Sequence, residues 1–397
     1  MSIRREVLDF LLDHRGWIKK SPKDLHRRLY NLGIDVSMDD IRAYQAEARV
    51  IIKEPSTEEY SDNEDNITDR MRVKKVWITP EGKKGVSYEV SPKEESESSI
   101  IETIERIVKE GITPYAPKVS ERSTNEKMLS VFTSDKHIGA HTPLNSIYSN
   151  RYDKEEIYER HEKLIDHITK QKKVFGKFRT FCFFDLGDAL DGSDSSTVRG
   201  GHYLPQNMDD REQLDTLIEV TIMTLEALIK ADIADDFWFI ATSNDNHAGS
   251  FGHGALRAIQ MYIQAKYPFV KTLITGKPLE HITFGNHTYI FGHGKDDADM
   301  RSGLPLNLNE KTENFINDYI DRKKLSSKYV HVQKGDLHQS STNYGKRFRY
   351  CNNMSMYGSS KWIHSNFGSG KAGVDYEIAE LYGSDIYRSR LIYGHDS

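Results

Sequence analysis

The sequence predicts an α/β protein with a small helical segment before it. From Met128 onward, short apolar strands alternate with helical stretches, such as Lys154–Gln171 and Glu212–Lys230. The strands are rich in Phe, Val and Ile, which is typical of sheets covered by helices. The chain before residue 90 shows helical periodicity and then a hairpin pattern, and a charged stretch without apolar residues, 91–99, follows it.

The N-terminal segment has the element order of a winged helix-turn-helix domain. Apolar residues of REVLDFLLDHR lie on one helical face, and SPKDLHRRLYNLGI begins with a serine cap and Pro22 and ends at Gly33. A third helix is expected from Ser37, with Ile41, Tyr44 and Ala48 at helical spacing. RMRVKKVWITPEGKKGVSYEV then predicts two strands around a turn.

Basic residues gather on the second helix and the hairpin of this segment. The candidate nucleic-acid contacts there are Lys19, Lys20, Lys23, Arg27, Arg28, Lys74, Lys75, Lys83 and Lys84. Such surfaces of a winged helix face the phosphates of DNA. A winged helix that only joins proteins together is the alternative, because exposed basic faces are often simply solvated.

Length and composition set the broad class. A chain of 397 residues accommodates one large domain and a smaller one, and we expect them at 127–397 and 1–90, joined by a linker and short helix at 91–126. The formal net charge of −5 confines nucleic-acid contact to a local basic face. Two cysteines and the absence of a long apolar run favour the cytoplasm (the host's, if a phage encodes the chain) and no membrane contact.

Five predicted strands each end in potential metal ligands. Asp135 and His137 follow MLSVFTS, Asp188 and Asp191 follow TFCFFDL, Asn246 and His247 follow DFWFIATS, His293 follows HTYIFG, and Asp336 and His338 follow YVHVQK. Ligands of α/β domains collect at the carboxyl ends of strands. An Asp and a His two residues apart on an extended segment point the same way, and a carboxylate from the next strand can lie between two cations. The pattern predicts a dinuclear metal centre.

The order Asp-x-His, Gly-Asp-x-x-Asp, Asn-His, His-Gly, Gly-x-x-His resembles the calcineurin-like metallophosphoesterase superfamily, over about Met128–Gln339. The resemblance implies two β-sheets packed face to face with helices outside, a four-layer sandwich. It also implies a phosphoester hydrolase in which a metal-bridging hydroxide attacks phosphorus.

The resemblance assigns a role to each matching residue. Asp135, His137 and His338 would bind the first metal, Asp188 would bridge, and Asn246 and His293 would bind the second. His247 would assist the leaving group rather than bind metal, and Asp191 would support its loop.

Two positions depart from the family pattern. Asp245 stands where the family has glycine, so the turn must be made differently, and it brings a further negative charge. Asp336 stands where the family has a histidine that binds the second metal. We expect Asp336 to take over as ligand, with His331 or water as the alternative. A carboxylate there favours two Mn²⁺ ions, or Mg²⁺, over Zn²⁺.

The N-terminal segment, the loop with Arg199 and the tail YGKRFRYCNNMSMYGSSKW favour DNA as substrate, since basic residues among aromatics suit backbone contact and base stacking. For the tail, an amphipathic strand with core aromatics is an equal alternative. The first hypothesis is therefore a phosphodiesterase similar to the nuclease subunit of double-strand-break repair complexes and its phage-encoded relatives. A phosphomonoesterase or nucleotide hydrolase with a partner-binding N-terminal domain is the second, and a weakly active DNA-binding or assembly module is the third. The sequence is compatible with a homo-oligomer and with a protein partner, and it does not choose between them.

Overall fold

The computed structural model describes residues 7, 10, 11, 22–31, 34, 36, 37, 40–42, 44, 45, 48, 71–78, 84–90, 112–116, 121–142, 151–197, 204–296, 300, 302–359 and 370–394. The chain divides into two units, Met1–Lys93 and Glu94–Ser397. The finer division at residues 90 and 126 stays a prediction.

The first unit contains the predicted second helix and the predicted hairpin. Helix α2 spans Pro22–Asn31, and strands β1 (Met71–Ile78) and β2 (Lys84–Val90) pair antiparallel. Residues 40–42, 44, 45 and 48 are helical, and the Ser37 hydroxyl accepts a hydrogen bond from the Asp40 N–H at 3.2 Å, as a helix cap does. A small core of buried apolar side chains contains Val7, Leu11, Leu25, Leu29, Val36, Ile41 and Ala48. The winged-helix assignment itself depends on segments outside the described residues and remains a prediction.

The second unit is built on two sheets. The six-stranded sheet has the order β13-β12-β3-β4-β5-β6, and the five-stranded sheet has the order β10-β11-β9-β8-β7. The strands of the first are β3 (Lys127–Thr133), β4 (Phe178–Asp185), β5 (Ala234–Thr242), β6 (Lys271–Thr275), β12 (Gly373–Glu380) and β13 (Ile386–Ile392). Those of the second are β7 (Glu280–Phe284), β8 (His287–Phe291), β9 (Tyr329–Lys334), β10 (Ser341–Tyr344) and β11 (Arg349–Asn352).

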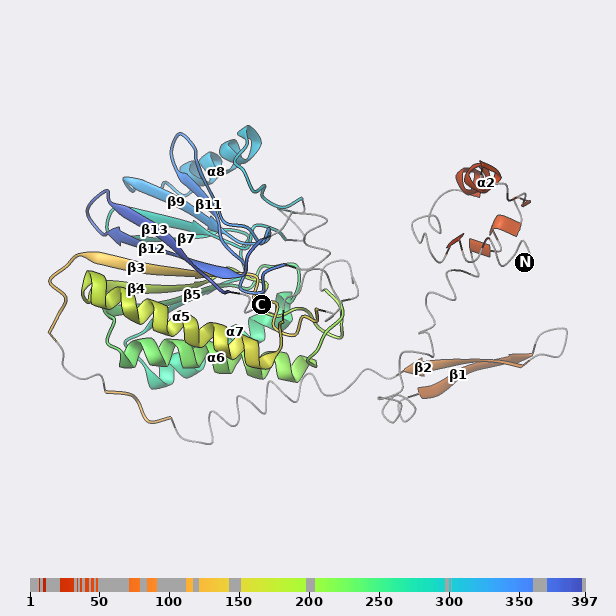
Figure 1. Cartoon of the computed structure of the whole chain (residues 1–397), viewed down its shortest axis with the longest axis horizontal. Helices are drawn as coiled ribbons and strands as arrows, with labels where there is room; N and C mark the ends of the chain where they lie inside the picture. Colours follow the sequence, from red (N-terminus) through yellow and green to blue (C-terminus); the bar gives the residue numbers. More distant parts are fainter. Residues whose placement is uncertain are drawn as a thin grey trace. The chain divides into compact units, whose positions relative to one another are not determined.

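Helices cover the outer faces of both sheets, as Figure 1 shows. Helices α5 (Lys154–Phe175), α6 (Asp210–Lys230) and α7 (Gly249–Lys266) pack on the six-stranded sheet, and α8 (Glu310–Arg322) packs on the five-stranded one. Asp209 begins α6 with a capping box to Glu212, as the sequence order Asp-x-x-Glu dictates. The α/β class and the two packed sheets flanked by helices are thus confirmed.

A separate apolar core joins the two sheets. Phe132, Cys182 and Phe184 of the six-stranded sheet pack against Tyr289 and Phe291 of the five-stranded one. Strands β3, β4, β5 and β6 run parallel, as do β8, β9 and β11. Parallel strands end at the same edge of a sheet, so the segments after β3, β4 and β5 gather there.

Two further sequence expectations concern cysteines and membranes. Cys182 and Cys351 are both buried and free. Within the part of the chain that the structure describes, no helix is both long and apolar enough to cross a membrane.

Candidate metal centre

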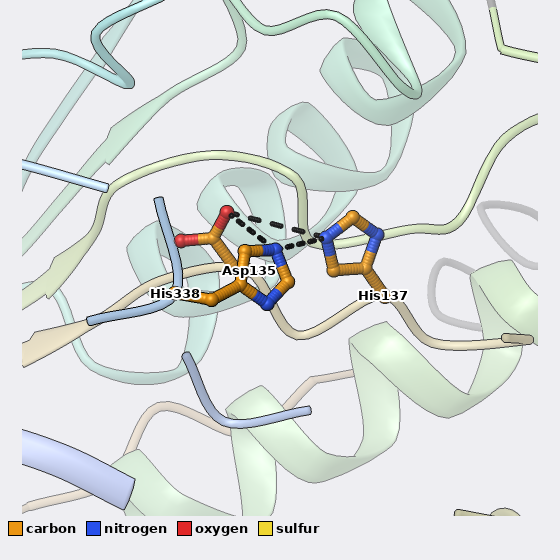
Figure 2. Close-up of side chains that lie close together, drawn as sticks. All are labelled: Asp135, His137 and His338. Atoms are coloured by element: carbon orange, nitrogen blue, oxygen red, sulfur yellow. Dashed lines mark hydrogen bonds and ion pairs between the residues drawn. The ribbon is translucent and has the colours of Figure 1, made fainter. Parts of the chain in front are cut away.

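The segments after β3, β4, β5, β8 and β9 bring the predicted ligands together. Three groups of side chains each place their ligand atoms within 4.8 Å of one another: Asp135, His137 and His338; Asp135, Asp188 and His293; and His137, Asp191 and His247. Figure 2 shows the first group, in which the two imidazoles and the carboxylate point toward one another. Residues that lie 201 positions apart in the chain therefore share one site.

The first group is tightly packed. Nε2 of His137 lies 3.2 Å from Nε2 of His338, and Nε2 of His338 lies 3.4 Å from Oδ1 of Asp135. Nε2 of His137 lies 4.0 Å from both Oδ1 of Asp135 and Oδ2 of Asp188. All four residues are almost completely buried.

Asp188 connects this group with the second one. Its Oδ2 lies 3.0 Å from Nε2 of His293 and 3.8 Å from Nε2 of His247. Its Oδ1 accepts the backbone N–H of His247 at 3.2 Å. The Asp188 carboxylate therefore stands between His137 on one side and His293 on the other, which is the position a bridging carboxylate needs.

Each of the four histidines is held through its Nδ1 atom. Nδ1 of His293 donates to the Leu186 carbonyl at 2.9 Å, and Nδ1 of His338 donates to the Gly358 carbonyl at 2.8 Å. Nδ1 of His247 donates to the Asp191 carbonyl at 2.8 Å, and Nδ1 of His137 lies 3.2 Å from the Asp191 carboxylate. Because carbonyl and carboxylate oxygens only accept, Nδ1 carries a proton, and in the neutral ring Nε2 keeps its lone pair for a cation. This orientation by an outer partner is typical of metal-binding histidines.

Three buried polar atoms of the site have no hydrogen-bond partner among the described residues. They are Oδ1 of Asp135, Oδ1 of Asn246 and Nε2 of His293. A buried polar atom without a partner costs about 1–3 kcal/mol, so such atoms are rare unless a ligand satisfies them. All three belong to residues for which the sequence predicts metal binding, and the donor set of oxygens and imidazoles fits divalent cations.

The backbone at the strand ends is strained at the predicted ligands themselves. Five predicted ligands have left-handed φ angles: Asp135 (48°), His137 (44°), Asp188 (48°), Asp336 (74°) and His338 (53°). Non-glycine residues adopt this region at a cost and do so most often at functional sites. The preceding Gly187 has φ 93°, and a Cβ there would lie 3.0 Å from that of His293, so glycine allows the β4 turn to approach β8.

The charges of the site act strongly on one another. Burial alone would lower the pKa of His293, but the carboxylates of Asp188, Asp135 and Asp336 outweigh it and raise that pKa well above its ordinary value. Burial and the charge of Asp188 raise the pKa of Asp245 to about 6. Burial lowers the pKa of His338 to about 4. The site thus concentrates negative charge that divalent cations would balance.

The two departures from the family pattern have structural explanations of different kinds. Oδ1 of Asp245 accepts the backbone N–H groups of Ala248 and Gly249 at 2.9 Å, and so caps the start of α7. Its Oδ2 accepts the N–H of Asp188 at 3.2 Å. Asp245 thereby fixes the turn between β5 and α7 and holds the backbone at Asp188.

Asp336 lies at the edge of the site. Its Oδ1 is 3.9 Å from Nε2 of His293, and it belongs to none of the three groups named above. His331, the alternative ligand, points elsewhere: its Nε2 lies 3.0 Å from Nδ1 of His287, and its ring contacts Tyr289. Between these two residues, Asp336 is the one near His293.

Sequence reasoning gave no role at the metal centre to the loop 353–359, which carries no His, Asp, Glu or Cys. Ser355 donates its hydroxyl to the Asp135 carbonyl at 2.9 Å, and Gly358 fixes His338. The loop is held from α5, where the Arg160 guanidinium donates to the Tyr357 carbonyl at 3.1 Å. These contacts use backbone carbonyls, for which the sequence has no signal.

The predicted nucleic-acid contacts are only partly described. Lys23, Arg27 and Arg28 are exposed on α2. Lys19, Lys20, Lys83 and Arg199 lie outside the described residues; Lys74, Lys75 and Lys84 lie in β1 and β2, of which only the strands are described. The stacking role for the tail is wrong for Phe348, Tyr350 and Tyr357, which are buried, and Arg349 pairs with buried Glu377 at 2.6 Å. These aromatics lie in the core, as the alternative expected, but of the three only Tyr350 lies in a strand, β11.

Comparison with known proteins adds distant structural similarity. No protein-family model and no curated protein sequence matches the chain. Among solved structures, Vps29 of Entamoeba histolytica complexed with Zn²⁺ is 12% identical, covering 67% of this chain and 99% of that one, at a TM-score of 0.28. An archaeal phosphodiesterase is 9% identical, and the match covers 66% of this chain and 100% of that one at a TM-score of 0.32. A 5′-nucleotidase of Staphylococcus aureus, so named provisionally, is 12% identical. The match covers 68% of this chain and 55% of that one at a TM-score of 0.31.

Proposed function

We propose that the protein hydrolyses phosphoesters at a site for two divalent cations. The observation that carries the proposal is the convergence of imidazole Nε2 atoms and carboxylates from five strand ends, with every Nδ1 already engaged. The order of these residues along the chain resembles the calcineurin-like metallophosphoesterases, which supports phosphoesters as the substrate class.

The residues divide into two ligand sets with one shared member. Asp135, His137 and His338 would hold the first cation, and the second would be held by Asn246, His293 and Asp336, with Asp188 common to both. Two bound divalent cations supply charge neutralisation and an activated water for in-line displacement at phosphorus. Mn²⁺ is proposed because carboxylate and amide oxygens make up much of the donor set, with Mg²⁺ next and Zn²⁺ last.

His247 has the geometry of a proton donor. Its Nδ1 is fixed on the Asp191 carbonyl, and its Nε2 lies 3.8 Å from Oδ2 of Asp188. Its side chain is 16% exposed, compared with 0% for His293 and 5% for His338. A protonated Nε2 at this more open position can pass its proton to the oxygen that leaves phosphorus.

DNA is the substrate that we propose first. The support is the exposed basic face of α2, with Lys23, Arg27 and Arg28, on a separate unit of the chain. A phosphodiester backbone binds such a face through its charge alone. Hydrolysis of a phosphomonoester or nucleotide, with the first unit binding a protein partner, is the second candidate, because the described site residues are the same for both reactions.

A substrate panel tests these proposals. Labelled single- and double-stranded DNA, p-nitrophenyl phosphate and bis(p-nitrophenyl) phosphate are incubated with Mn²⁺, Mg²⁺, Zn²⁺ or Ni²⁺ and after chelation. We expect metal-dependent cleavage of DNA and of the bis ester. Cleavage of the monoester without DNA cleavage would select the second candidate. Metal-independent DNA binding with no hydrolysis of any substrate would replace both by a DNA-binding or assembly module.

A further inference from the structure

A lysine stands at the edge of the candidate metal centre. Lys295 follows His293 and Gly294 at the end of β8, and its Nζ lies 3.9 Å from Oδ1 of Asp336. The same Oδ1 lies 3.9 Å from Nε2 of His293. The Asp336 carboxylate is therefore flanked by an imidazole on one side and an ammonium group on the other.

The backbone around Lys295 fixes its direction. The N–H of Leu304 donates to the Gly294 carbonyl at 2.7 Å and so holds the segment after residue 302 against the β8 end. Gly303 has φ 72°, and a Cβ there would lie 3.2 Å from Oδ2 of Asp336 and 3.8 Å from Cδ of Lys295. Both side chains thus pack against the same glycine, so Lys295 is not a freely extended surface lysine.

Two other lysines near the site are already paired with groups of the protein. Lys136 is completely buried and pairs with Asp185. Lys334 is completely buried and donates to the Gly335 carbonyl at 3.0 Å and to Oδ1 of Asn352 at 2.5 Å. The side chain of Lys295 is 25% exposed, and its ammonium group makes no hydrogen bond to the described part of the chain. It is the lysine of the three that can reach a molecule entering from solvent.

The charges at the site indicate a function for Lys295. Asp135, Asp188 and Asp336 together carry three negative charges toward the proposed cations, which offsets most of the positive charge that two divalent ions bring. A phosphate group is itself negative, and phosphoryl-transfer sites commonly hold its oxygens with a lysine or arginine beside the metal ions. The Lys295 ammonium group makes no hydrogen bond to the described residues and belongs to a side chain that is 25% exposed, so it meets that need.

We infer that Lys295 binds a non-bridging oxygen of the substrate phosphate, held in place by its ion pair with Asp336. This inference depends on the proposed phosphoester hydrolysis and adds the residue that recognises the phosphate. Asp336 would then hold the second cation together with His293 and also position the phosphate-binding ammonium group.

The experiment compares Lys295→Met and Lys295→Arg with the wild-type full-length chain. Lys172→Met is the matched control, because the Lys172 side chain is 31% exposed and also lies in an ion pair, with Asp232 at 3.9 Å. For each protein, bound Mn²⁺ is counted by elemental analysis. The affinity for inorganic phosphate is measured by calorimetry on the Mn²⁺-loaded protein, and kcat and KM are measured with bis(p-nitrophenyl) phosphate.

We expect Lys295→Met to weaken phosphate binding and raise KM by about tenfold or more, the usual effect of removing a hydrogen bond to a charged group. Lys295→Arg should stay within about threefold of the wild type because it keeps the charge, and Lys172→Met should be unchanged. Mn²⁺ content should be the same in all four proteins.

Unchanged phosphate affinity in Lys295→Met would overturn the inference. Loss of Mn²⁺ in Lys295→Met would also overturn it, because Lys295 would then act only by placing Asp336. Failure of the proposed function looks different: the wild type itself would hydrolyse no ester and bind no phosphate in the presence of Mn²⁺.

Discussion

Nδ1 of His137 lies 3.2 Å from Oδ1 of Asp191, and both side chains are almost completely buried. The contact fixes the imidazole so that Nε2 faces His338 and Asp135. Asp191 also holds His247 through its backbone carbonyl. One residue thus orients a proposed metal ligand and the proposed proton donor.

The first prediction removes the charge of Asp191. Asp191→Asn should weaken Mn²⁺ binding at the first site by about tenfold, because partners of metal-binding histidines typically contribute 10–100-fold to affinity. The measurement is a Mn²⁺ titration of the metal-free protein. Asp194→Asn, at an exposed position in the same loop, is the control and should leave affinity unchanged. Equal affinities for the two variants would show that Asp191 does not orient His137.

The second prediction concerns His247. His247→Gln should lower kcat by about 10²-fold or more while both Mn²⁺ ions stay bound, because general acid catalysis contributes about 10²–10⁴-fold. The loss should be larger for an alkyl phosphodiester than for the bis(p-nitrophenyl) ester, whose leaving group needs little protonation. A loss of metal in this variant would instead make His247 a ligand.

The third prediction concerns the identity of the metal. Replacing Asp336 with histidine should move the preference of the second site from Mn²⁺ toward Zn²⁺, because imidazole is a softer donor than carboxylate. Activity with each metal and competitive metal binding measure the preference. A preference that does not move would mean that Asp336, at 3.9 Å from His293, does not select the metal.

The fourth prediction concerns stability at low pH. Glu377 is completely buried between Arg349 at 2.6 Å and Arg388 at 2.7 Å. Burial alone would raise the pKa of Glu377, but the two guanidinium groups outweigh it and lower that pKa to about 2 from its ordinary 4.5. A carboxylate with a lowered pKa stabilises the folded state above pH 4.5, and this stabilisation is lost as the pH falls toward 2.

The free energy of unfolding should therefore fall by about 2 kcal/mol between pH 5 and pH 3 through Glu377 alone. Urea unfolding of the metal-free protein, followed by circular dichroism, measures it at both pH values. Glu377→Gln should be less stable at pH 7 by about 3–5 kcal/mol, since it leaves two buried charges short of a partner, and should lack this part of the pH dependence. Glu310→Gln, at an exposed position, should behave like the wild type. The same pH dependence in Glu377→Gln would refute the assignment.

The fifth prediction separates the two units. Deletion of the residues before Ser99 should weaken binding of long DNA and make it less sensitive to salt, because fewer phosphate contacts remain. Hydrolysis of small esters should stay within about twofold, since every described residue of the candidate centre lies in the second unit. Binding in a salt series and ester hydrolysis are the two measurements. Equal losses in both would give the first unit a structural role.

The sequence by itself determined the sheet-forming strands, the polar residue types at five strand ends and their order. Strand periodicity is local, and parallel strands of one sheet end at one edge, so the meeting of Asp135 and Asp188 follows from the sequence pattern. His293 follows a strand of the other sheet, and only the packing of the two sheets brings it to them. The second helix and the hairpin of the first unit were likewise predicted from caps and turn residues.

Only the tertiary structure decided how these residues are supported. The Gly358 carbonyl on His338, the capping role of Asp245 and the place of Lys295 beside Asp336 depend on loops that meet across two sheets. The burial of the tail aromatics was also decided by the tertiary structure, since Phe348 and Tyr350 lie in the core and not on the surface. The physical reason is that local patterns fix which face and which edge a residue occupies, whereas its partner is fixed by the packing of distant segments.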